Sequence, residues 1–97
     1  MGLGFNGGEL LALAIGGCFC NDMQAIADQM GATIADLKVS VDVDFGGEPT
    51  RATDARLTVE CTLADGSDPS QLIERAKADT TIGNSLRDGI PVNIGAA

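Results

Sequence analysis

The sequence predicts a single α+β domain in which one long central helix packs on an antiparallel sheet. One observation behind this prediction is an apolar stretch of helical length over residues 8–30. The other is a pair of segments, 37–45 and 55–63, in which apolar and polar side chains alternate. A chain of 97 residues suits one domain, and its 44% content of hydrophobic residues is that of a chain that folds around a core.

The first predicted element is a helix over residues 8–30. Asn6 is a suitable N-cap, and Gly31 stands where a left-handed residue ends many helices. Apolar side chains occur nearly all round this helix, which predicts that it is covered on several sides. One broad face carries Leu11, Ile15, Cys18, Phe19, Ile26 and Met30, and the opposite side of the first turns carries Leu10, Leu13 and Ala14.

Two adjacent glycines, Gly16 and Gly17, stand in the middle of the predicted helix. Each costs about 1 kcal/mol of helix stability relative to alanine, so a compensating interaction is expected. The close approach of another backbone is the usual reason for such glycines. We therefore expect an intertwined homodimer whose two-fold axis lies near these two residues.

The two alternating segments predict an antiparallel pair of strands. The side chains expected to face the core are Val39, Val41, Val43 and Phe45 in the first strand and Leu57, Val59, Cys61 and Leu63 in the second. Gly46-Gly47-Glu48-Pro49 ends the first strand. The connection that follows is expected to be mobile or to cover a site.

The last third of the chain predicts two shorter helical segments and a strand. Asp68 followed by Pro69 predicts the start of a helix that runs to about Asp79. Thr80 and Thr81 are expected to begin a helical turn over residues 82–87, and residues 90–94 are expected to form a closing edge strand. Three strands beside so apolar a helix make an incomplete sheet, which again indicates a second molecule.

Composition excludes several classes of function. The net charge of −8 argues against nucleic acid and anionic membranes as partners, because both are bound mainly through Lys and Arg. The chain has no His, which excludes Ser-His and Cys-His couples and His-based metal sites, and no metal or cofactor is expected. Three cysteines, at positions 18, 20 and 61, suggest free thiols in a reducing compartment, hence the cytoplasm. No apolar run is expected to reach the length that crosses a bilayer.

Two stretches of the sequence are similar to motifs of a known family. Asn6-Gly7-Gly8-Glu9-Leu10-Leu11, then a run of small residues and Cys18-Phe19, resembles the signature of the OsmC/Ohr family of osmotically inducible and organic-hydroperoxide-resistance proteins. Residues 78–86, followed by Gly89-Ile90-Pro91-Val92, resemble the family's stretch before its closing strand. The resemblance implies one OsmC-like domain over residues 1–97 that corresponds to the later part of a full-length relative, without the family's leading strands.

The resemblance implies a thiol peroxidase. In the family, one cysteine, activated by an Arg and a Glu, attacks the peroxide, and a second cysteine closes a disulfide that an external dithiol reduces. By position, Cys18 matches the attacking thiol and Thr80 the second cysteine. The catalytic Glu falls on Gly8, with Glu9 one residue later and turned by about 100° on a helix. The family's Arg falls in the leading region.

The residues themselves leave the role of Cys18 open between a reactive thiol and a small apolar core residue. A thiol reacts as its thiolate, which a cation or a helix N-terminus favours, whereas Asp22 at i+4 would disfavour it. Arg51, Arg56, Arg87 or a partner chain are the candidate sources of a cation. Cys20 and Cys61 are interpreted as structural, although Cys61 would approach Cys18 if the helix packed on its strand.

The leading hypothesis is an OsmC-like homodimer that reduces or senses organic hydroperoxides through Cys18, with an external thiol as reductant. Glu9 is interpreted either as a charge that complements the helix dipole or as a displaced catalytic acid. The rival hypothesis is a non-catalytic dimer of the same fold that binds a small apolar ligand or a partner. A third alternative is that a separate subunit supplies the missing strands and the Arg.

Overall fold

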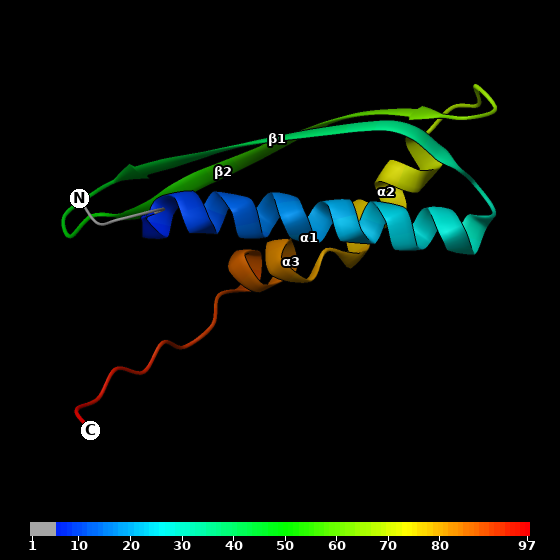
Figure 1. Cartoon of the computed structure of the whole chain (residues 1–97). Coiled ribbons are helices and arrows are strands. Elements are labelled where there is room, and N and C mark those ends of the chain that lie inside the picture. Colours follow the sequence, from blue (N-terminus) through cyan, green and yellow to red (C-terminus); the bar gives the residue numbers. More distant parts are fainter. Residues whose placement is uncertain (1–5) are drawn as a thin grey trace.

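The structure is a computed structural model that describes residues 6–97. Its elements are α1 (Gly7–Met30), β1 (Ile34–Gly46), β2 (Arg51–Leu63), α2 (Ser70–Asp79) and α3 (Thr81–Asp88). The two strands form an antiparallel hairpin that lies along α1, and α2 and α3 contact α1 from another side (Figure 1). The predicted α+β arrangement, with a long helix on an antiparallel pair of strands, is confirmed.

Both ends of α1 are capped as the sequence predicts. At the start, the N–H of Glu9 donates to Asn6 Oδ1 at 2.8 Å, and the N–H of Asn6 donates back to Glu9 Oε1 at 3.4 Å. This reciprocal capping box satisfies two backbone donors that the helix itself leaves free. At the other end, Gly31 has φ 72° and ψ 22°, and its N–H reaches the carbonyls of Ala27 and Asp28. Such a left-handed stop suits glycine, which has no Cβ to clash.

α1 is buried on only part of its circumference. The side chains that enter the core are Ile15, Phe19, Met23, Ile26 and Ala27. Leu10 and Leu13 are 53% and 55% exposed, so the prediction that the helix is covered on several sides is wrong within a single chain. The two glycines also differ: a Cβ on Gly16 would lie 3.2 Å from Val41 Cγ2, whereas one on Gly17 would meet nothing within 4 Å. The close approach at Gly16 is therefore made by β1 of the same chain.

The hairpin is longer than the alternation of apolar residues predicts. Pairing runs from Ile34↔Leu63 to Gly46↔Arg51, with register shifts near each end of the ladder. The connection is a turn at residues 47–50, so it is shorter than the gap between the two predicted strands. Residues 52–54, expected to belong to the connection, lie in β2 and line a cavity. The segment Arg51–Arg56 has few apolar side chains, and the backbone hydrogen bonds to β1 keep it in the sheet.

The C-terminal segment departs furthest from prediction. α2 and α3 appear where helices are expected, and Asp68 Oδ1 accepts from the N–H and Oγ of Ser70 at 3.0 and 2.7 Å. Residues 89–97 have no regular structure, so the closing strand expected at 90–94 is wrong in the single chain. After α3 the chain leads away from the hairpin (Figure 1). Its apolar side chains, Ile90, Val92 and Ile94, are 69%, 76% and 93% exposed.

The core lies where α1, the hairpin and α2 meet. Its buried members are Phe19, Met23, Ile26, Ala27, Leu63, Leu72 and Ala76. By length and composition alone α1 would pass as a membrane span, so the expectation that no apolar run reaches that length is wrong. Core helices of soluble proteins pass the same test, and α1 contributes five residues to the buried set.

Candidate functional site

The sulfur of Cys18 lies beside two oxygen atoms that different elements supply. Thr80 Oγ1, at the junction of α2 and α3, donates to Cys18 Sγ at 3.8 Å. Cys18 Sγ in turn donates to Asp22 Oδ2, one turn further along α1, at 3.8 Å. Both are weak hydrogen bonds, because sulfur is a poor donor and acceptor. Thr80 is 62 residues away in the sequence, so the contact exists only in the folded chain.

Thr80 is fixed by its backbone. Its N–H donates to the carbonyl of Ala76 at 3.0 Å, and its own carbonyl accepts from the N–H of Asn84 at 2.9 Å. The residue is 8% exposed and is the only polar residue classed as buried in the part of the chain that the structure describes. Composition and periodicity predicted only a helix start here. The contact with Cys18 was missed, and the resemblance, which aligns the two positions with a pair of cysteines, was the signal for it.

A cavity of about 840 Å³ opens beside Thr80, between α1, the hairpin, α2 and α3. This volume lies within the usual range for small-molecule sites. Its apolar lining includes Leu11, Ile15, Phe19, Leu57, Val59 and Leu86. Three cationic side chains, Arg56, Lys77 and Arg87, line the same cavity. Two carboxylates, Asp54 and Glu74, line it as well, and they form ion pairs with Arg56 and Lys77 at 2.7 and 3.4 Å. The site therefore combines an apolar space with charges of both signs near its walls.

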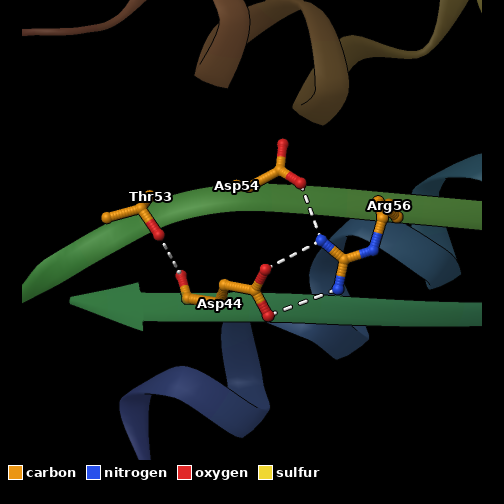
Figure 2. Close-up of polar contacts among 4 residues, drawn as sticks. All are labelled: Asp44, Thr53, Asp54 and Arg56. Carbon is orange, nitrogen blue, oxygen red and sulfur yellow. Dashed lines mark hydrogen bonds and ion pairs between the residues drawn. The ribbon is translucent and has the colours of Figure 1, made fainter.

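The cation of Arg56 is already paired with carboxylates (Figure 2). Arg56 Nη1 lies 2.8 Å from Asp44 Oδ2 and 2.7 Å from Asp54 Oδ2. The hydrogen bonds that Arg56 donates hold the pKa of Asp44 below its ordinary value, and acceptance of these bonds by Asp44 and Asp54 raises the pKa of Arg56. Arg56 thus stays charged and is held in ion pairs, with its side chain about half exposed.

The other candidate cations are engaged locally. Arg87 Nη1 donates to Asn84 Oδ1 at 2.6 Å, and Arg51 Nη1 donates to the carbonyl of Pro49 at 3.1 Å. Within residues 6–97, no Lys or Arg side chain hydrogen-bonds to Cys18 Sγ. None of the arginines considered from the sequence therefore contacts the thiol in a single chain.

Glu9 belongs to the cap of α1. Its carboxylate accepts from the N–H of Asn6, and nine residues of helix separate it from Cys18. At 1.5 Å per residue, this places the two about 13 Å apart along the axis. Gly8, the position that the resemblance aligns with the catalytic Glu, lies close to the ring of Phe45, since a Cβ there would be 2.9 Å from its Cζ.

The other two cysteines lie apart from this site. All three thiols are free. Cys20 lines a small hollow of about 230 Å³ between α1 and β1. Cys61 is paired with Leu37 in the hairpin and packs against the core. Burial and, secondly, the charge of Asp36 raise the pKa of the Cys61 thiol.

Comparison with known proteins places the fold in a family. A family model described as an OsmC-like protein matches residues 1–95. Among solved structures, the chain is similar to an OsmC-like protein of unknown function from Vibrio cholerae O1 biovar eltor, with a TM-score of 0.69 and 18% sequence identity. The match covers 79% of this chain and 55% of the other, so this chain spans little more than half the length of that relative. No curated relative matches the chain.

Cys61 is expected to be alkylated by iodoacetamide more slowly in the folded protein than in the urea-unfolded chain, at the same pH. The raised pKa leaves less thiolate at a given pH, and the thiolate is the reacting form. Asp36→Asn removes the nearby negative charge and is expected to quicken the reaction. Peptide mass spectrometry of the labelled protein measures both rates. Equal rates in the folded and unfolded chains would contradict the assigned burial.

Proposed function

Because this chain belongs to the OsmC-like protein family, we propose that it reduces or senses organic hydroperoxides through Cys18, as a homodimer in the cytoplasm. The observation that supports this most strongly is the contact of 3.8 Å between Thr80 Oγ1 and Cys18 Sγ. The resemblance aligns these two positions with the family's two cysteines, and the fold brings them together. This contact supports a site related to that of the family, with a hydroxyl in place of the second thiol.

The proposed reaction uses one cysteine. Cys18 Sγ attacks the terminal oxygen of the hydroperoxide, the O–O bond breaks, and the thiol proton ends on the leaving alkoxide. The products are a Cys18 sulfenic acid and an alcohol. Two equivalents of an external thiol then regenerate Cys18. The first displaces the oxygen as water and forms a mixed disulfide with Cys18. The second attacks this mixed disulfide, which frees the Cys18 thiol and forms a disulfide between the two external thiols.

Activation of the thiol needs a positive charge, and within the described residues no Lys or Arg side chain hydrogen-bonds to the sulfur. Asp22 accepts the thiol hydrogen at 3.8 Å and so orients Cys18 Sγ. Lys77 and Arg87 line the adjoining cavity together with Thr80, and we propose them as the sources of charge within the chain. Lys77 lies 3.4 Å from Glu74, so this pair would have to open. A second copy of the chain is the other source that we propose.

The exposed face of α1 supports a homodimer. Leu10, Leu13, Gly17 and Cys20 follow the helical spacing of three and four residues, which places them on one stripe. Leu10 and Leu13 are half exposed, and Gly17 has open space where a side chain would be. Only 28% of the most apolar window of α1 is buried within the chain. A second α1 crossing this stripe would cover apolar surface that a monomer leaves in water.

The cavity of about 840 Å³ favours a second candidate function. A largely apolar space of this size suits a small apolar ligand, which would bind without any reaction at Cys18. The two functions differ at Cys18: peroxide reduction requires its thiol to be oxidised, whereas ligand binding leaves the thiol unchanged.

In the first experiment, Cys20 and Cys61 are replaced by serine, so that Cys18 is the remaining thiol. One equivalent of cumene hydroperoxide is expected to convert Cys18 to a sulfenic acid, which dimedone labels and mass spectrometry localises. The variant that also carries Cys18→Ser serves as the control and is expected to stay unlabelled. A folded protein whose Cys18 thiol survives the peroxide would contradict the peroxidase proposal and favour ligand binding.

Glu9 is expected to act as a cap and not as an acid in the reaction. Glu9→Gln keeps a side chain that can close the capping box, so both the melting temperature and the rate of Cys18 oxidation are expected to stay near their original values. Glu9→Ala opens the box and is expected to cost about 0.5–1 kcal/mol in the free energy of unfolding, again with little change in the rate. Loss of the rate in Glu9→Gln would identify the carboxylate as part of the chemistry.

Association through α1 is testable by analytical ultracentrifugation. Leu13→Glu places a charge on the proposed contact in both copies and is expected to weaken the dimer about tenfold or more, the effect of about 1.4 kcal/mol. Gln29→Glu makes the same charge change on the opposite side of α1 and is expected to leave association unchanged. A wild-type chain that remains monomeric at high concentration, or a Leu13→Glu variant that dimerises equally well, would exclude this interface.

A further inference from the structure

We propose that Thr80 is a positioning residue that, together with Asp22, holds oxidised Cys18 as a sulfenic acid until an external thiol arrives. This inference rests on the proposed function, because it concerns the state that follows oxidation of Cys18. The oxidised form of the protein is then a persistent sulfenic acid and not an internal disulfide.

The first support is that the Thr80 hydroxyl does not cap the helix that begins at this residue. Thr80 is the N-cap of α3, where threonine normally accepts a hydrogen bond from a backbone N–H of the first turn. Its side chain makes no such bond, and its hydroxyl donates instead to Cys18 Sγ. A local stabilising interaction is thus absent, and a contact with a residue far away in the sequence takes its place.

The second support is the packing that fixes this rotamer. A Cβ on Gly83 would lie 2.8 Å from Thr80 Cγ2, closer than real contacts allow. Gly83 therefore provides the space into which the Thr80 methyl group points. With the methyl group against Gly83 and the backbone bonded on both sides, the hydroxyl is directed at Cys18.

The third support is the match between the two neighbours of the sulfur and a sulfenic acid. An S–OH group has one hydrogen to donate and an oxygen that accepts. Asp22 Oδ2 already accepts from Cys18, and Thr80 Oγ1 already donates to it. One added oxygen on Cys18 would find the same acceptor and donor, so the oxidised residue keeps both hydrogen bonds.

The fourth support is that no thiol stands where it could replace this oxygen. Two residues of helix turn Cys20 about 200° away from Cys18. Cys61 belongs to β2 and packs into the core, and all three cysteines are free. A disulfide requires close and well-directed Cβ atoms, and within residues 6–97 the polar neighbours of Cys18 Sγ are the Asp22 carboxylate and the Thr80 hydroxyl.

The inference is tested first by the lifetime of the sulfenic acid. The full chain, carrying all three cysteines, receives one equivalent of cumene hydroperoxide, and dimedone is added after increasing delays. Thr80→Val keeps the shape but loses the hydroxyl and is expected to shorten the lifetime about fivefold, which is the effect of one ordinary hydrogen bond. Thr80→Ser keeps the hydroxyl but loses the methyl group that directs it, and is expected to restore part of the lifetime. Equal lifetimes in the wild type and Thr80→Val, or prompt formation of a disulfide from Cys18 in the wild type, would overturn the inference.

A second variant separates this inference from the proposed function. Thr80→Cys, made with Cys20 and Cys61 replaced by serine, is treated with diamide, which takes two electrons and two protons from a pair of thiols. A disulfide between Cys18 and the introduced thiol is expected, and peptide mapping detects it. Failure of this bond to form would overturn the inference, because position 80 would not reach the sulfur. The disulfide could also form in a protein whose Cys18 resists peroxide. That result would support the position of Thr80 beside the sulfur, but it would contradict both the proposed peroxidase function and the persistent sulfenic acid.

Discussion

The packing of α1 against the junction of α2 and α3 is the constraint on which the site depends. It brings a hydroxyl from position 80 to the sulfur of Cys18, and it does so without any strong bond between them. The position is set by burial of Met23 and Leu72, both almost fully inaccessible, and by the backbone bonds that end α2 and begin α3 at Thr80. Because hydrophobic burial supplies the driving force and glycine at position 83 supplies the space, the polar contact is a result of the packing and not its cause.

The charges of the chain explain why a single copy makes an incomplete site. Arg56 is held between two carboxylates, Arg51 and Arg87 bond to neighbours, and the thiol faces a carboxylate of its own helix. The apolar stripe on α1 is also uncovered, and the C-terminal segment has no partner strand. A second copy would supply a charge, a cover for the apolar stripe and a strand to pair with. This coincidence is why we propose that the complete site forms in an assembly.

Local chemistry in the sequence was sufficient to predict much of the fold. The caps at Asn6 and Gly31 depend on neighbouring residues alone, and the alternation in the two strands reports one buried face, so both could be predicted. The extension of β2 through Arg51 could not, because backbone pairing and not burial holds that polar segment in the sheet. Residues 90–94 alternate as a strand does, but alternation does not say whether an edge is available to pair with.

The site shows the same division. Cys18 was identified as the candidate thiol from the motif, yet nothing in composition or spacing predicts that position 80 reaches it.

The most direct test of the proposed chemistry at Cys18 is a crystal structure of the protein after one equivalent of hydroperoxide. The account predicts a single oxygen atom on Cys18 Sγ, within hydrogen-bonding distance of both the Thr80 hydroxyl and the Asp22 carboxylate. An unmodified sulfur, or a disulfide from Cys18 to another cysteine of the chain, would contradict it.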